Sequence, residues 1–175
     1  MDEPKKWRHR LNSAFDLPEV PLAGKVDNNL EREDATARSA QESFHQRKIL
    51  IVEDEPELAA LLEHFLRNKG FVTATANNGL TACRMINALR PDLVLLDIKL
   101  PELDGWEVCR LVRKIPDHHL ASTPIMMLSA LATNWDREQG LKLGANDYMT
   151  KPYSLKEIVH RANTLIDQHQ ANSKN

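Results

Sequence analysis

KILIVEDEPELAALLEHFLRNKG (48–70) decides the fold class, because a strand in it is followed directly by a helix. KILIV (48–52) is a short, continuous apolar run rich in β-branched residues, as expected for a strand buried on both faces. Apolar side chains then recur at helical spacing from Leu58 to Leu66, and Gly70 provides a stop for that helix. The stretch therefore predicts one strand–helix unit of an α/β protein.

The same alternation continues to the end of the chain. Further strands are expected at FVTAT (71–75), LVLL (93–96), PIMML (124–128) and NDYM (146–149). Further helices are expected at about 77–89, 108–115, 133–144 and 155–166. Alternating strands and helices favour a parallel sheet with helices on both faces and right-handed crossovers. We therefore expect a doubly wound α/β fold with a five-stranded parallel sheet and five helices.

Composition and charge exclude several classes of function. The chain of 175 residues carries 23 Lys and Arg against 25 Asp and Glu, so no basic excess is present to bind nucleic acid. The N-terminus MDEPKKWRHR has no apolar segment of the kind found in secretory signals, and no apolar run is long enough for a membrane span. Cys83 and Cys109 lack the spacing of a metal site. A reducing, cytoplasmic location is the default expectation.

Residues 1–46 differ in composition from the remainder. Most of this part has few apolar side chains to bury. We interpret it as an N-terminal extension that is either a linker or weakly helical. Trp7, Leu11 and Phe15 recur every four residues, which predicts a short amphipathic helix that docks on its own domain, frays, or binds a partner. We expect one domain at 47–170 and a disordered tail at 171–175. We expect no output domain after it, so the chain would be either a stand-alone unit or a fragment.

Chemically matched side chains follow four of the predicted strands. In open parallel sheets, sites form beyond the carboxyl ends of the strands. These residues are Glu53 and Asp54, Asp97, Ser129, and Lys151. Neighbouring carboxylates repel, and a divalent cation relieves that repulsion. A lysine and a hydroxyl then suit phosphate oxygens, and Asp97 is placed to act as a nucleophile that forms an acyl phosphate. The alternative for a single acid such as Asp54 is a turn residue or helix N-cap.

Four motifs in these segments resemble the receiver domain of two-component response regulators. They are VEDEP (52–56), LLDIKLPELDGWE (95–107), MLSA (127–130) and GANDYMTKPYSLKEI (144–158). The resemblance covers residues 47–170 and implies a flavodoxin-like fold with strand order 2-1-3-4-5. It also implies phosphorelay signal transduction by a protein that is a switch and not a turnover enzyme.

The resemblance assigns roles at the strand ends. It implies that Asp97 is the phospho-acceptor, with Mg²⁺ (or Mn²⁺) held by Glu53, Asp54, Asp97 and the backbone carbonyl of Lys99, Asp54 being the more direct ligand of the acid pair. Ser129 and Lys151 would bind the phosphoryl group, and a cis Lys151–Pro152 bond is expected. Ser129 and Tyr148 would act as the switch, with Tyr148 turning inward on phosphorylation. Departures from the family pattern are Lys99, Leu100 and Asn146.

The resemblance also implies partners. The phosphoryl group would come from a sensor histidine kinase or histidine phosphotransfer protein, and a downstream protein target would read the switch. A homodimer is expected through the fourth predicted helix, the fifth strand and the last helix. Its charged residues would be Arg137, Asp147, Glu157 and Arg161, for which an ordinary solvated surface is the alternative.

Two other functions compete with this interpretation. A phosphorylation-independent interaction module of the same shape usually lacks one of the acids or the lysine, and all are present here. An aspartyl-nucleophile phosphohydrolase needs a DxDxT motif after a strand, and DIKLP (97–101) lacks the second Asp and the Thr.

Overall fold

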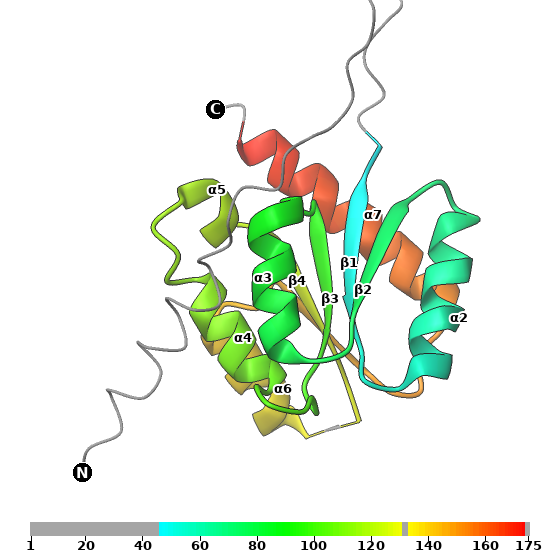
Figure 1. The fold of residues 1–175 in the computed structure, drawn as a ribbon, viewed down its shortest axis with the longest axis horizontal. Coiled ribbons are helices and arrows are strands. Elements are labelled where there is room, and N and C mark those ends of the chain that lie inside the picture. The colour runs from blue at the N-terminus through cyan, green and yellow to red at the C-terminus, as the bar shows by residue number, and fades with distance from the viewer. Residues whose placement is uncertain (1–45, 131–132, 174–175) are drawn as a thin grey trace, which may run out of the picture.

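The computed structural model describes residues 46–130 and 133–173 (Figure 1). The segment with Trp7, Leu11 and Phe15 lies outside the described residues, as does nearly all of the expected extension. The prediction for that segment therefore stays a prediction.

Five strands form one all-parallel sheet in the order β2-β1-β3-β4-β5, as expected. The strands are β1 (Lys48–Val52), β2 (Val72–Ala76), β3 (Leu93–Asp97), β4 (Ile125–Ser129) and β5 (Asp147–Thr150). Asp97 and Ser129 are the last residues of their strands, where we had expected them one position beyond. This order makes β1 and β3 neighbours, so the carboxyl ends of β1, β3 and β4 meet at one edge of the sheet.

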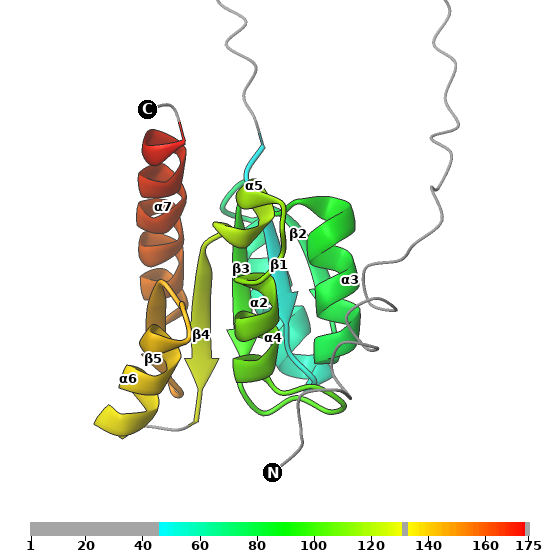
Figure 2. The ribbon, with the colours of Figure 1, turned by 90° about the vertical axis from the view of Figure 1, so that its left-hand side faces the viewer.

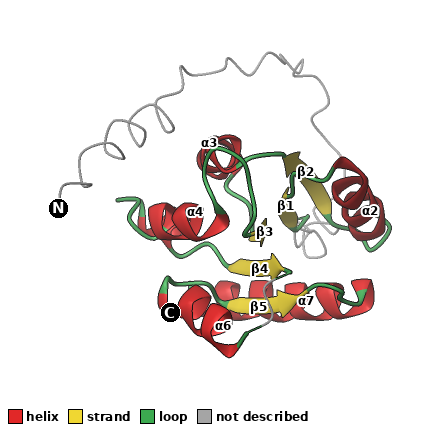
Figure 3. Ribbon diagram, turned by 90° about the horizontal axis from the view of Figure 1, so that it is seen from below, coloured by secondary structure: helices red, strands yellow, loops and turns green. Residues whose placement is uncertain are grey.

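Side chains alternate between two apolar cores, one on each face of the sheet. Ile49 and Ile51 of β1 point to the face covered by α2 (Pro56–Arg67) and α7 (Leu155–Asn172). Leu50 and Val52 point to the opposite face, which is covered by α3 (Gly79–Leu89) and α4 (Gly105–Val112) (Figure 3). The central strands are thus buried on both sides, which explains their unbroken apolar sequences.

Polar residues define where the helices begin. The side chain of Asn78 accepts a hydrogen bond from Thr81 N at the start of α3. Thr133 and Asp136 form a reciprocal capping box at the start of α6 (Asn134–Lys142). Both caps lie at positions where the sequence predicted helix starts.

Three details differ from the sequence prediction. The described residues contain six helices where the sequence predicted five, and the additional one is α5 (His118–Ala121). It forms because Asp117 accepts hydrogen bonds from His119 N and Leu120 N. The helix α4 ends at Val112, earlier than expected. The helix α7 continues to Asn172, since no glycine or proline ends it, and so enters the segment expected as a tail. No helix in residues 46–130 or 133–173 is long and apolar enough to cross a membrane.

Candidate functional site

Three carboxylates come together at the carboxyl ends of β1 and β3. One ligand atom from each of Glu53, Asp54 and Asp97 lies within 4.8 Å of the others. Glu53 is 2% exposed and Asp97 5% exposed, whereas Asp54 is open to solvent. Burying two carboxylates side by side is unfavourable unless a cation compensates their charge. The cluster is therefore built to receive positive charge.

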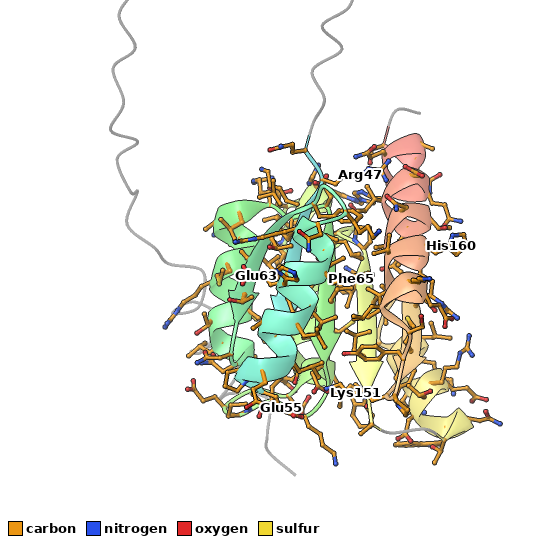
Figure 4. All side chains as sticks on the ribbon, turned by 90° about the vertical axis from the view of Figure 1, so that its right-hand side faces the viewer. Arg47, Glu55, Glu63, Phe65, Lys151 and His160 are labelled. Carbon is orange, nitrogen blue, oxygen red and sulfur yellow. The ribbon has the colours of Figure 1, made fainter. Side chains whose placement is uncertain are left out.

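Lys151, which follows β5, supplies part of that charge. Its Nζ donates hydrogen bonds to Glu53 Oε2 at 2.8 Å and to Asp97 Oδ2 at 2.6 Å. Figure 4 shows Lys151 at the same end of the molecule as Glu55, opposite the end where Arg47 lies. The Lys151–Pro152 bond is cis, as the sequence led us to expect.

The electrostatics of this cluster follow from burial and pairing. Burial lowers the pKa of Lys151, but the hydrogen bonds to Asp97 and Glu53 outweigh it, so the pKa lies above its ordinary value. Burial raises the pKa of Glu53, and the hydrogen bond from Lys151 opposes that shift only in part. Lys151 is therefore positively charged, and a further cation would stabilise the negative charge of Glu53 and Asp97.

Backbone groups hold Asp97 from the other side. Its Oδ1 accepts hydrogen bonds from Ile98 N at 2.6 Å and from Lys99 N at 3.2 Å. Gly105, at the start of α4, approaches the Asp97 backbone so closely that a Cβ would lie 2.1 Å from Asp97 O. Sequence reasoning assigned no role to Gly105, although its place in LPELDG (100–105) was the available signal.

Asp54 is not a helix cap. The N-cap of α2 is Glu55, and it makes no side-chain capping hydrogen bond. Asp54 instead lines a groove of about 480 Å³ beside the acid cluster, together with Glu53, Glu63, Asn77 and Thr81. The alternative interpretation of Asp54 as a cap is therefore wrong.

The two predicted switch residues contact each other. Tyr148 is 4% exposed, and its side chain is hydrogen-bonded to the side chain of Ser129, which is fully buried. Ser129 also accepts a hydrogen bond through its carbonyl oxygen from Lys151 N at 2.7 Å. The Tyr148 ring thus lies in the inward position that the resemblance associates with phosphorylation.

The four charged residues predicted for a dimer face lie on α6, β5 and α7. Arg161 pairs with Asp147 at 2.9 Å and with Glu157 at 2.6 Å within the same chain. Arg137 is exposed and lines, with Glu157 and Arg161, a groove of about 300 Å³. Within the described part of the chain, the Arg137 side chain has no hydrogen bond or ion pair.

Tyr153 is a neighbour of the cluster that sequence reasoning missed. Its hydroxyl is buried and has no hydrogen-bond partner among the described residues. Burial raises the pKa of Tyr153 to about 12. The KPY sequence (151–153) gave its position but no signal for an unpartnered hydroxyl.

Comparison with known proteins identifies the family of this chain. A family model described as the response regulator receiver domain matches residues 49–163. The alkaline phosphatase synthesis transcriptional regulatory protein PhoP of Bacillus subtilis is 40% identical over 120 residues, 69% of this chain and 48% of that protein. The chain therefore spans about half the length of this curated relative.

Two solved structures share the fold. The receiver domain of the sensor histidine kinase PA1611 from Pseudomonas aeruginosa, with a magnesium ion coordinated in its active-site cleft, is 34% identical with a TM-score of 0.64. That match covers 70% of this chain and 98% of the other. The BeF3-activated N-terminal receiver domain of Klebsiella pneumoniae RstA is 32% identical, with a TM-score of 0.63 and coverage of 69% and 98%. The fold and the family match agree, and the chain belongs to the response regulator receiver domains of two-component signal transduction.

Proposed function

We propose that Asp97 accepts a phosphoryl group in a phosphorelay and that this event switches a protein-binding face. The observation that carries the proposal is the position of the Asp97 carboxylate. It is held by Lys151 on one side and by two backbone N–H groups on the other, next to Glu53 and Asp54. This arrangement orients a nucleophile and keeps cationic charge beside it.

The acid cluster fits a divalent cation. Carboxylate oxygens are the ligands that Mg²⁺ prefers, and three of them lie within 4.8 Å of one another. Glu53, Asp54, Asp97 and the backbone carbonyl of Lys99 would hold Mg²⁺ or Mn²⁺, with exposed Asp54 the more direct ligand of the acid pair. When bound, such a cation neutralises negative charge on phosphoryl oxygens. The magnesium in the related receiver of PA1611 supports this assignment.

The reacting groups of this chain have distinct tasks. An Asp97 carboxylate oxygen attacks phosphorus of a phosphohistidine, the new O–P bond forms as the P–N bond breaks, and the departing imidazole nitrogen takes up a proton from solvent. Lys151 then pairs with a phosphoryl oxygen in place of the free carboxylate oxygen. The Ser129 hydroxyl donates a hydrogen bond to another phosphoryl oxygen. The Tyr148 ring, in contact with Ser129, transmits the change to α6, β5 and α7.

The donor would be a sensor histidine kinase or a histidine phosphotransfer protein. The chain would act as a switch and not as a turnover enzyme, with a downstream protein as its reader. A cytoplasmic location is part of the proposal, supported by two buried free cysteines in the described residues.

One further observation supports a homodimer through α6, β5 and α7. Arg137 has no ion-pair partner in the described part of its own chain, yet it lies in the groove beside Glu157. A second copy related by two-fold symmetry would bring acidic side chains of this face opposite Arg137. Sedimentation with and without beryllofluoride tests this step. An unchanged mass at high micromolar concentration overturns it.

Intact mass measurement tests the phosphorylation itself. The protein is incubated with Mg²⁺ and a small phosphodonor, alongside Asp97→Asn and an EDTA control. We expect one added phosphoryl group on the wild-type protein and none in either control. No adduct, together with no binding of beryllofluoride, would overturn the proposal in favour of a phosphorylation-independent module.

A further inference from the structure

The helix α6 contributes almost nothing to the apolar cores. Only two of its residues are buried, Asp136 of the capping box and Gly140. Figure 2 shows α6 beside β5 at the edge of the sheet, away from α2 and α3. Since burial of apolar surface is what ordinarily fixes a helix, α6 must be positioned by a small number of specific contacts.

Gly140 provides one of these contacts. A Cβ at this position would lie 3.1 Å from Cδ2 and 3.5 Å from Cε2 of Tyr148, and 2.9 Å from Sδ of Met127. The aromatic ring therefore lies against the helix backbone at the place where a side chain would begin. Glycine inside a helix is ordinarily unfavourable, so a glycine here is explained by this close approach.

The ring that occupies this space is the predicted switch residue. Tyr148 is hydrogen-bonded through its side chain to Ser129. Ser129 in turn accepts a hydrogen bond from the backbone of Lys151, the residue that holds Asp97. A continuous set of contacts thus runs from the carboxylate cluster through Ser129 and Tyr148 to Gly140.

We propose that Gly140 is a positioning residue of the switch. The missing Cβ lets α6 lie directly on the inward ring of Tyr148, so the position of α6 follows the position of that ring. Any side chain at 140 competes with the ring, and with the Met127 sulfur beside it, for the same space and uncouples the helix from the site. The inference deepens the proposed function and rests on it for the part that involves phosphorylation.

A reporter for α6 is already present in the molecule. Trp135, in the first turn of α6, is 59% exposed, and its ring centroid lies 6.0 Å from that of Trp106 on α4, edge to face. Displacement of α6 changes this contact and with it the tryptophan fluorescence. In the 175-residue chain, the substitution Trp7→Phe removes the third tryptophan, which lies outside the described residues.

The first test needs no phosphodonor. The urea midpoint is compared for wild type, Gly140→Ala, Tyr148→Ala and the double variant, with Lys142→Ala as a control at an exposed position of the same helix. We expect Gly140→Ala to lower the midpoint clearly with Tyr148 present and to lower it much less in Tyr148→Ala, where the ring is gone and only the flexible Met127 side chain has to move. NMR should show the Tyr148 ring more exposed in Gly140→Ala.

Each outcome of that comparison decides the matter. Equal changes of the midpoint in both backgrounds, whether increases or decreases, would overturn the proposal, because the ring would then not limit the space at 140. If Gly140→Ala does not fold but the double variant does, the proposal is supported. If Tyr148→Ala folds and the double variant does not, it is overturned, since removing the ring should relieve the conflict.

The second test addresses the switch. Beryllofluoride with Mg²⁺ should change the Trp106–Trp135 fluorescence of the Trp7→Phe protein, and Gly140→Ala should lose most of that change while still accepting a phosphoryl group on Asp97. A full fluorescence response in Gly140→Ala would overturn the coupling. If the wild-type protein takes up no phosphoryl group, the proposed function fails, whereas the urea comparison still decides the role of Gly140.

Discussion

The ammonium group of Lys151 lies 2.6 Å from Asp97 Oδ2, although the two residues are separated by 54 positions in the chain. The sheet order explains the contact, because only β4 lies between β3, which ends at Asp97, and β5, which precedes Lys151. The side chains are 18% and 7% exposed, respectively. In this environment each charge depends on the other for compensation, with Glu53 as the third member of the group.

Lys151→Ala should therefore destabilise the protein strongly in the absence of divalent cations. The substitution leaves two buried carboxylates without a counter-charge, and removing one partner of a buried ion pair costs about 3–5 kcal/mol. Urea unfolding in EDTA measures the change. Lys142→Ala is the matched control, because its pair with Glu138 is exposed and contributes about 0–1 kcal/mol. Equal losses in the two variants would contradict the prediction.

Added Mg²⁺ should raise the thermal midpoint of the wild-type protein. A ligand that binds only the folded state stabilises it by mass action, by about 2.7 kcal/mol at a concentration of 100 Kd. Asp54→Ala should remove most of this increase, because Asp54 is the solvent-exposed member of the acid cluster. Glu63→Gln, in the same groove but outside that cluster, should keep it. A magnesium response that survives in Asp54→Ala would show that the cation binds elsewhere.

The strand-end residues were predictable because a parallel sheet fixes where strand ends meet. Once KILIV, LVLL and PIMML are recognised as buried strands, Glu53, Asp97 and Ser129 must lie at the same edge. Their place at one edge follows from the fold class, whereas their being neighbours depends on the strand order. The strand order itself came from the family resemblance and not from the periodicity of the sequence.

Features that depend on close packing were not predictable in the same way. Gly105 and Gly140 are single residues whose role is to let another atom approach, and sequence periodicity carries no signal for what approaches. The helix α5 is too short for a periodic pattern, and only its cap, Asp117, marks it. The unpartnered hydroxyl of Tyr153 arises from packing between distant segments, so a local pattern cannot show it.

Substitution of Arg113 should destabilise the fold more than most substitutions outside the site. Its guanidinium donates hydrogen bonds to the carbonyls of Gly144 at 2.9 Å, Ala121 at 2.8 Å and Thr123 at 2.9 Å, and to Asn146 Oδ1 at 2.8 Å. These acceptors join α4 to the segments on either side of β4. Arg113→Met should cost about 2–4 kcal/mol in urea unfolding, because several buried carbonyls lose their donor together.

Arg110→Met is the matched control for Arg113. Arg110 lies on α4, which Arg113 directly follows, and among the described residues its ion pair is with Glu107 at the surface. Its loss should stay below about 1 kcal/mol. Amide hydrogen exchange in α5 should accelerate in Arg113→Met and not in the control. Equal exchange rates would show that Arg113 does not hold that segment.

The two thiols should make the protein less stable at alkaline pH. Cys83 and Cys109 are fully buried, and burial raises their pKa values to about 12 and about 11, respectively. In the unfolded chain a thiol loses its proton near pH 8.5, so above that pH the unfolded state binds fewer protons than the folded state. The free energy of unfolding should therefore fall as pH rises, by about 1 kcal/mol for each thiol between pH 9 and pH 10. A Cys83→Ala/Cys109→Ala variant, compared with wild type by urea unfolding across this range, should show a shallower decline, and identical slopes would mean that the buried thiols do not cause it.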